Sequence, residues 1–440
     1  MSLSISLIGQ LKSKQKIIFN SLWVITDKVV RMVGGLVVGI WVARYLGPYN
    51  FGAFNYATSI IAICGPLIGL GLNDIVLTDL IKRVDKGRVL FTSLVLKLCS
   101  GAIMCLAVYL FSFTLGNQDV TRVLLIVLSF QLIFQSSDIF DIFNQSRTES
   151  KNSVIAKTSA YIIVNIIKVI ALLNGFSLVF YGMLTVLELV IASGILIYFY
   201  FYLSNQNTRD WVFDRNLAKS LLARSWPLII SDLFISFYMR LDQLMLKHMA
   251  GYNELGRYSA ALRLSEIHYF LASAICVSIY PSIVKLKEKS ELEFMNGFQK
   301  LFNILVALSV SIALFFTFFA GYITHFLYGE KFPGVGIILS VHIWTGVFVF
   351  LGVGSSNWFI VNNLQRYVVI RTITGAVLNI GLNLILIPHY LSLGSAVATL
   401  IAQMFASVFA NYFSKRTRPI FWLQIRSFFS LFKPSVKNYI

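Results

Sequence analysis

Forty-three consecutive residues, from Thr372 to Ser414, contain no Asp, Glu, Lys or Arg. This stretch is too long for one buried helix of a globular domain, but it fits two membrane spans of about 20 residues each. A turn between these spans is predicted at 388–394, where Pro388 and Gly394 interrupt the apolar run. The chain is therefore predicted to lie in a bilayer.

The composition of the whole chain agrees with a membrane location. Only 13% of its residues are charged, whereas soluble proteins carry about 25%. Apolar runs predict twelve membrane helices. Their expected ranges are 18–44, 52–72, 90–113, 122–143, 154–173, 177–203, 225–247, 256–283, 299–321, 335–360, 368–388 and 394–413.

A polar stretch at 204–224 separates the first six predicted spans from the last six. We therefore expect an all-α integral membrane protein with an N-terminal lobe at 1–203, a linker at 204–224 and a C-terminal lobe at 225–413. The residues that follow, 414–440, combine Lys and Arg with Trp and Phe. Such a basic amphipathic tail predicts an interfacial helix on the anionic inner leaflet.

The net charge of +18 is distributed along the chain. A nucleic-acid-binding protein concentrates its Lys and Arg in one patch or stripe, so nucleic acid is not an expected partner. Here the basic residues gather in alternate loops between apolar runs, which predicts that both termini lie in the cytoplasm and that the number of spans is even. These loops contain Arg366 and the basic residues of 82–88, 147–151, 209–219, 285–289 and 415–418.

Motifs of soluble and metal-dependent enzymes are missing from the sequence. It contains no GxxxxGK[ST], HExxH or CxxC pattern, and its four Cys and five His residues lack metal-ligand spacing. The predicted external loops are too short to hold a separate catalytic domain. No metal, no cofactor and no enzymatic activity are therefore predicted.

The two halves of the chain contain a similar element after their first predicted span. The segment Gly47–Phe54 parallels Gly251–Tyr258, and the paired glycines and the following Ala57 and Ala261 keep an offset of 204 residues. Six spans per half, both starting on the same side, predict two lobes related by a pseudo-two-fold axis along the membrane normal. Secondary transporters use this symmetry and bind substrate between their halves.

Several charged residues fall inside predicted spans, where an ionised group is costly unless it is paired or lies in a wet interior. The cations predict a polar cavity for a diphosphate or an acidic sugar, and we expect substrate contacts from Arg31, Arg263, Lys28 and Arg240. The acids are candidates for ion coupling or for pairing with these cations, and they are Asp27, Asp232, Asp242, Glu266 and Glu188.

A structural role for the same charges stays open. Asp27 and Arg31 are four residues apart, and Arg263 and Glu266 are three apart, so each pair shares one helix face and can form an ion pair. Lys97 can extend its amine to the membrane interface. Lys168 is an isolated charge in the fifth predicted span.

The segment 43–54 reads ARYLGPYNFGAF. It resembles the first-loop signature of the Wzx-type flippases of O-antigen and exopolysaccharide repeat units. The segment 327–332, LYGEKF, resembles the element before their tenth span. Asn379, Asn383 and Pro388, followed by GSAVAT at 394–399, resemble the pattern across their last two spans. The similarity covers nearly the whole chain, within the multidrug/oligosaccharidyl-lipid/polysaccharide exporter (MOP) superfamily.

The resemblance implies a two-lobed transporter of the bacterial inner membrane. Its implied substrate is an undecaprenyl-diphosphate-linked oligosaccharide, which moves from the inner to the outer leaflet by alternating access coupled to an ion gradient. Membrane lipid, a polysaccharide polymerase and a chain-length regulator are the further partners that it implies. In the related lipid II flippases, cations of the first span line the central cavity, and Arg31 is the nearest equivalent here. The additional pair of C-terminal spans found in lipid II flippases is missing, which disfavours a peptidoglycan substrate.

Two other functions remain as alternatives. A multidrug antiporter of the same superfamily would have a cavity dominated by acids that bind cations. A membrane enzyme of polysaccharide assembly would alter polymer length instead of trapping lipid-linked units.

Overall fold

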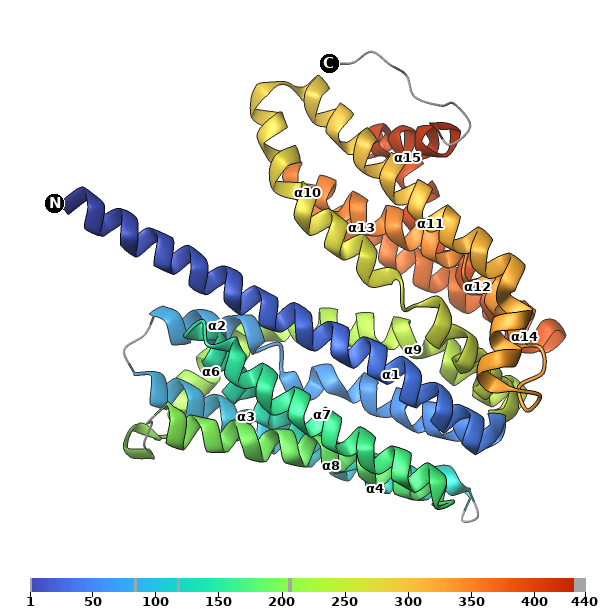
Figure 1. Cartoon of the computed structure of the whole chain (residues 1–440), viewed down its shortest axis with the longest axis horizontal. Helices are drawn as coiled ribbons and strands as arrows, with labels where there is room; N and C mark the ends of the chain where they lie inside the picture. Colours follow the sequence, from blue (N-terminus) through green and yellow to red (C-terminus); the bar gives the residue numbers. More distant parts are fainter. Residues whose placement is uncertain (1, 83–84, 117–118, 205–207, 431–440) are drawn as a thin grey trace. The chain divides into compact units, whose positions relative to one another are not determined.

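The computed structural model describes residues 2–82, 85–116, 119–204 and 208–430, and these residues contain no β-strand. Residues 431–440 of the predicted tail and 205–207 of the predicted linker lie outside the described residues. In the first half the helices are α1 (Ser2–Gly69), α2 (Asn73–Lys82), α3 (Lys86–Ser112), α4 (Val120–Ser129), α5 (Gln131–Phe134), α6 (Asp138–Ser146), α7 (Ser150–Leu173) and α8 (Leu178–Tyr198) (Figure 1). In the second half they are α9 (Arg215–Ser265), α10 (Tyr269–Lys289), α11 (Glu291–Tyr328), α12 (Val335–His342), α13 (Thr345–Val361), α14 (Gln365–Ser407) and α15 (Arg418–Ser430).

The helices account for twelve membrane crossings. Nine stretches within the described residues are long and apolar enough to cross a membrane. Three of them, of 61, 75 and 48 residues, far exceed the length of about 20 residues that one crossing needs. Each contains a non-helical residue, at Gly47, Gly251 and Leu391 respectively, that divides it into two. Nine stretches plus three divisions give twelve spans, and the break at Leu391 lies in the predicted turn at 388–394.

The breaks at Gly47 and Gly251 have the same geometry. Their φ and ψ angles are 73° and 170° at Gly47 and 86° and 179° at Gly251. This conformation is open to glycine and unfavourable for residues with a Cβ atom. Because the two residues are 204 apart, the structure repeats the backbone turn where the sequence repeats its motif.

The two repeated motifs also contact each other through their second glycines. A Cβ atom at Gly52 would lie 1.9 Å from the carbonyl oxygen of Tyr252, and one at Gly256 would lie 1.9 Å from that of Pro48. Pro48 and Tyr252 are themselves equivalent positions of the repeat, so the contact is reciprocal. Such a reciprocal contact is the mark of a local two-fold axis.

The described chain forms two compact units, of which the second includes Gly47–Gly52 and Leu241–Ile440. The first unit comprises the rest, up to Arg240. A core of buried aliphatic and aromatic residues from α2, α3, α6 and α8 holds the first unit, and a second core joins α10, α11, α13 and α15. The predicted lobe boundaries at 203 and 225 stay predictions.

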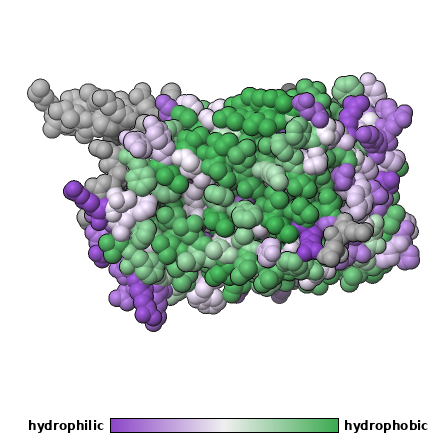
Figure 2. All heavy atoms as spheres, turned by 90° about the horizontal axis from the view of Figure 1, so that it is seen from below, coloured by the Kyte–Doolittle hydropathy of each residue, from purple (hydrophilic) through white to green (hydrophobic). Residues whose placement is uncertain are grey.

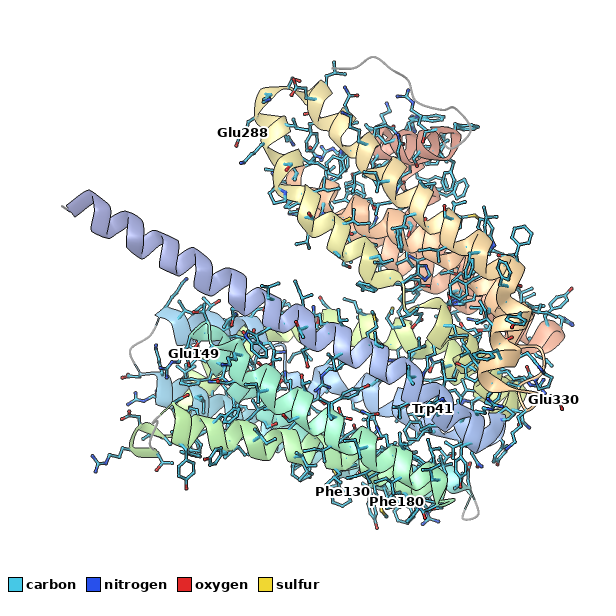
Figure 3. The ribbon with its side chains drawn as sticks, in the orientation of Figure 1. Trp41, Phe130, Glu149, Phe180, Glu288 and Glu330 are labelled. Carbon is cyan, nitrogen blue, oxygen red and sulfur yellow. The ribbon has the colours of Figure 1, made fainter. Side chains whose placement is uncertain are left out.

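Apolar side chains cover the outside of the helices. Figure 2 shows a broad hydrophobic area on one face, with hydrophilic residues gathered mainly toward the margins. Along α3, for example, Ile103, Leu106 and Leu110 are 57–61% exposed. Acidic side chains such as Glu149, Glu288 and Glu330 lie at or near helix ends instead (Figure 3). An apolar exterior between polar ends is what a bilayer requires.

We expect Gly256→Ala to lower the free energy of unfolding by about 3 kcal/mol, which is at the upper end for overpacking. The new Cβ atom would meet the backbone carbonyl of Pro48, which cannot move aside as a flexible side chain can. The matched control is Gly381→Ala in α14, since nothing lies within 4 Å of a Cβ atom at Gly381. Thermal unfolding of both variants in detergent, followed by size-exclusion chromatography, measures the difference. Equal melting temperatures for Gly256→Ala and the unaltered protein would contradict the tight crossing.

Candidate functional site

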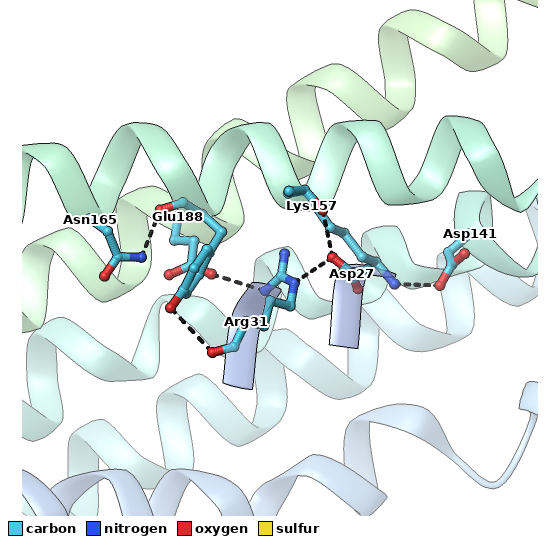
Figure 4. Close-up of polar contacts among 8 residues, drawn as sticks. Asp27, Arg31, Asp141, Lys157, Asn165 and Glu188 are labelled. Carbon is cyan, nitrogen blue, oxygen red and sulfur yellow. Dashed lines mark hydrogen bonds and ion pairs between the residues drawn. The ribbon is translucent and has the colours of Figure 1, made fainter. Parts of the chain in front are cut away.

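A network of charged side chains joins α1 to α8 inside the first unit. Arg31 Nε donates to Asp27 Oδ1 at 2.9 Å, and Arg31 Nη1 donates to Glu188 Oε1 at 3.2 Å (Figure 4). The ion pair predicted between Asp27 and Arg31 is therefore confirmed. Glu188 comes from a helix 157 residues away in the sequence, and only the fold brings it to Arg31.

Helix α7 supplies further contacts of this network. Thr158 Oγ1 donates to Asp27 Oδ1 at 2.7 Å, and the ring of Tyr161 lies 5.2 Å from the Arg31 guanidinium. Lys168 Nζ lies 3.9 Å from Glu188 Oε2. Lys168 and Glu188, which are isolated charges in the sequence, thus belong to one set with Arg31.

The network is electrically balanced and partly open. Its two cations, Arg31 and Lys168, face its two carboxylates, Asp27 and Glu188. The four side chains keep between 16% and 30% of their surface exposed. Lys28 is exposed beside them and makes no hydrogen bond or ion pair with any described residue. A charged ligand can therefore reach Arg31 and Lys28 from one side of α1.

A second polar group in the first unit surrounds Lys97. This side chain is fully buried, and its Nζ donates to Asp138 Oδ1 and to Asn73 Oδ1, both at 2.8 Å. The prediction that Lys97 extends to the interface is wrong, because a carboxylate from α6 is available inside the unit. Asp138 was not identified from the sequence.

A cavity of about 550 Å³ lies next to this pair. Two interruptions of helical structure shape it, one at Leu70–Leu72 between α1 and α2 and one at the 3₁₀ turn Gln135–Ser137. Irregular backbone at membrane depth is tolerated where it lines a cavity or is buried in protein. Polar side chains of the lining are Asn73, Asp74, Gln135, Asp138, Asp232 and Ser236. The structure therefore places Asp232 on an acidic cavity, not beside Arg31.

The predicted residues of the eighth span belong to the second unit. The guanidinium of Arg263 lies 5.2 Å from the centre of the Phe51 ring, which comes from the first repeated motif. Glu266 is exposed at the end of α9.

Arg240, from the seventh predicted span, is the last residue of the first unit. It is partly exposed, and it makes no hydrogen bond or ion pair with the described residues.

Asp242 is the most enclosed of the predicted carboxylates, with 8% of its surface exposed. It accepts a short hydrogen bond from the hydroxyl of Tyr258 and another from the backbone of Gln243. The Tyr258 hydroxyl lies 3.4 Å from Thr399 Oγ1, which in turn accepts from Asn379. Asn379 Oδ1 accepts from Asn383, whose own Oδ1 is buried without a hydrogen-bond donor among the described residues.

One buried cation was not predicted from the sequence. Arg371 is 8% exposed and donates to Ser355, Ser356 and the carbonyl oxygen of Gly352 at 2.6–3.1 Å. No carboxylate of the described residues pairs with it. It lies within the predicted span 368–388, immediately before the uncharged stretch that begins at Thr372.

Comparison with known proteins identifies the family. A family model described as "Polysaccharide biosynthesis protein" matches residues 17–287, more than half of the chain. The chain belongs to this polysaccharide biosynthesis family. The capsular polysaccharide biosynthesis protein CapF of Staphylococcus aureus is 23% identical over 386 residues, which cover 85% of this chain and 93% of CapF.

Solved structures of transporters share the fold. The lipid II flippase MurJ in an inward closed conformation has a TM-score of 0.72 at 14% identity, over 96% of this chain and 94% of MurJ. An inward-facing multidrug resistance MATE transporter of the MOP superfamily has a TM-score of 0.70 at 16% identity, over 92% and 96% of the two chains.

These likenesses confirm two of the predictions. The chain is an all-α, multi-pass membrane protein with twelve membrane-spanning helices in two lobes of six. The predicted resemblance to proteins of polysaccharide biosynthesis is confirmed by the family match and the capsular relative, and the fold is shared with MurJ and with a MATE transporter of the MOP superfamily.

We expect Lys97→Met to destabilise the protein by about 1–3 kcal/mol, because it leaves Asp138, which is 30% exposed on the cavity, without its cation. The double variant Lys97→Met/Asp138→Leu removes both charges and should recover most of this loss. Lys28→Met is the control for an exposed lysine and should melt like the unaltered protein. If the single and double variants melt together, Asp138 does not depend on Lys97.

Proposed function

We propose that this protein flips an undecaprenyl-diphosphate-linked oligosaccharide repeat unit from the inner to the outer leaflet of the bacterial inner membrane. Its polysaccharide biosynthesis family, its capsular relative and its transporter fold support this substrate class. The observation that carries the proposal is a partly exposed arginine, Arg31, held at membrane depth by two carboxylates.

Physical chemistry explains the need for such a site. A lipid-linked oligosaccharide cannot cross hydrocarbon unaided, since its diphosphate and hydroxyl groups would lose their hydration. Arginine replaces that hydration well because its planar guanidinium donates two parallel hydrogen bonds to phosphate oxygens. Arg31 and Lys28 are the first contacts that we propose for the diphosphate, and Arg263 and Arg240 are the proposed contacts from the second half.

We further propose that Asp242 couples transport to an ion gradient. Asp242 is a buried carboxylate at one end of a polar chain that runs through the hydroxyls of Tyr258 and Thr399 to the amides of Asn379 and Asn383. Oxygen atoms of such a chain can bind a small cation, and the carboxylate can bind a proton. The unpaired Oδ1 of Asn383 adds another acceptor to this cluster. Asp232, on the cavity of the first unit, is the competing candidate for ion coupling. Asp27 and Glu188 pair with Arg31, and Glu266 remains a candidate for ion coupling or charge pairing.

The proposed orientation follows from the charged loops. The positive-inside rule applied to the basic loops places both termini in the cytoplasm, where the repeat unit is assembled on its lipid. A polysaccharide polymerase and a chain-length regulator would then receive the product on the opposite side. The proposed cationic contacts also fit a repeat unit with neutral sugars, because the diphosphate alone supplies the negative charge that they bind.

In a deletion strain, we expect lipid-linked repeat units to be trapped in the inner leaflet and to appear outside when the protein is restored. A sugar-modifying enzyme added outside sealed spheroplasts measures this, because it reacts only with units in the outer leaflet. Units that appear outside without the protein would overturn the proposed function. Gain of drug resistance on expression, with no change in these units, would instead favour multidrug export, and altered polymer length would favour an assembly enzyme.

In the same assay, Arg31→Ala should slow the appearance of outer-leaflet units by about 10- to 100-fold. This factor corresponds to the loss of one charge-assisted hydrogen bond, which contributes about 1.5–3 kcal/mol. Arg31→Lys keeps the charge but loses the planar donor pair, and it should have an intermediate rate. The control is Arg44→Ala, since Arg44 is exposed and has no partner among the described residues. Equal rates for Arg31→Ala and Arg44→Ala would exclude Arg31 from the site.

We expect Asp242→Asn to abolish the acceleration of flipping by an imposed ion gradient while leaving the folded protein in the membrane. The amide keeps the size of the side chain but cannot supply the negative charge that holds a cation. Asp232→Asn is the matched variant for the competing carboxylate. The coupling proposal fails if the gradient still accelerates flipping by Asp242→Asn.

A further inference from the structure

One face of helix α15 packs into the core of the second unit. Ile420, Phe421 and Leu423 join the buried core formed with α11 and α13, and α15 lies beside α11 (Figure 1). Gln424 is fully buried, donates to the carbonyl oxygen of Ser407 at 3.0 Å and accepts from Asn411 at 3.0 Å. The predicted tail helix is thus fixed to protein along its inner face and does not rest on lipid alone.

The opposite face of α15 carries large aromatic and basic side chains. Trp422 is 48% exposed, Phe429 is 68% exposed, and Arg426 between them is exposed. These positions are four and three residues apart, so they form one stripe along the helix. Aromatic residues beside a cation are typical of the boundary between lipid headgroups and acyl chains.

A basic turn precedes this stripe and is held in place by its contacts. Ser414 Oγ lies 3.2 Å from the hydroxyl of Tyr367 and also accepts from the backbone of Arg416. The guanidinium of Arg366 lies over the Tyr367 ring at 5.1 Å. These contacts bring Arg366, from the start of α14, to the turn that contains Lys415 and Arg416.

No acidic side chain from this part of the chain offsets these cations. The sequence contains no Asp or Glu after Glu330. Helix α11, which packs against α15, begins with Glu291 and Glu293, and Glu288 precedes them, but Lys285, Lys287 and Lys289 of the same segment balance these three acids. The charge of the turn and the stripe is therefore positive.

We propose that the exposed side of α15 and the adjoining turn bind the headgroups of anionic phospholipids. This basic aromatic surface consists of Arg366, Lys415, Arg416, Trp422, Arg426 and Phe429. It follows directly after the last membrane span, so it lies at the level of the headgroups on the side that is predicted to be cytoplasmic. Its cations suit phosphate oxygens, and its aromatic rings suit the underlying acyl region.

This inference rests on the membrane fold and holds whether or not the protein flips a polysaccharide unit. Because Gln424 also lies 3.4 Å from the carbonyl oxygen of Leu351 in α13, α15 is hydrogen-bonded to the α13 span. Anionic lipid bound on the outer side of α15 therefore favours the folded state of the whole second unit by mass action.

The test is thermal unfolding of the purified full chain in detergent during titration with phosphatidylglycerol or phosphatidylcholine. We expect phosphatidylglycerol to raise the melting temperature and phosphatidylcholine to have a much smaller effect. Substituting four exposed cations, in Arg366→Gln/Lys415→Gln/Arg416→Gln/Arg426→Gln, should weaken the apparent affinity for phosphatidylglycerol at least tenfold, since each basic residue near an anionic surface contributes about a fivefold factor.

The matched control is Lys285→Gln/Lys289→Gln, which removes exposed lysines of the same unit from another element. It should keep the response of the unaltered protein. An equal response of the fourfold variant and this control would overturn the proposal. So would an equal stabilisation by inorganic phosphate at the same ionic strength, because that result indicates a site for small anions instead of a lipid surface.

A second measurement covers the case in which the fourfold variant does not fold. Brominated phosphatidylglycerol quenches the fluorescence of tryptophans at its acyl chains, and Trp422→Phe should remove part of this quenching. Unchanged quenching in Trp422→Phe would also overturn the proposal.

Discussion

The cost of an unpaired charge in hydrocarbon constrains this chain more than any other interaction. On a water-exposed surface an ion pair contributes little, but inside a membrane protein the loss of one partner leaves a charge that the bilayer cannot solvate. Cations inside the first unit therefore pair with carboxylates of other helices. Lys97 joins α3 to Asp138 on α6, and Arg31 joins α1 to Glu188 on α8. The polar groups that hold the first unit together are consequently the same kind of groups that could receive a charged substrate.

Features set by local sequence could be predicted, because neighbouring residues determine them. The apolar runs gave the twelve spans, the paired glycines marked the two repeated turns, and the four-residue spacing of Asp27 and Arg31 gave their ion pair. The partners of Lys97 and Glu188 could not be predicted, since periodicity does not show which helix faces meet. The pattern of α15 was also ambiguous, because an amphipathic helix can bury its apolar face in lipid or in protein. Only the fold shows that Gln424 forms buried hydrogen bonds with the second unit.

The two repeated motifs show how a duplicated sequence can build its own symmetry. Each motif supplies a sharp turn at one glycine and a surface without a side chain at the next. Pro48 then approaches Gly256 as closely as Tyr252 approaches Gly52. A side chain at either glycine would remove one half of the reciprocal contact. A single pair of similar motifs is weak evidence for an internal repeat in the sequence. The reciprocal contact explains the similarity, because it requires a glycine in each motif.

The balance of the Arg31 network has a consequence for the proposed transport. Arg31 already donates to two carboxylates, so a diphosphate gains only the difference between its own hydrogen bonds and those it replaces. Binding is therefore weaker than at an unpaired arginine. A carrier needs moderate affinity, because it must release the substrate on the other side of the membrane as well as bind it. Lys168 can retain Glu188 while Arg31 turns to the ligand, and Asp27 then keeps the hydrogen bond from Thr158. The carboxylates beside Arg31 would then limit affinity to the range in which a carrier can turn over.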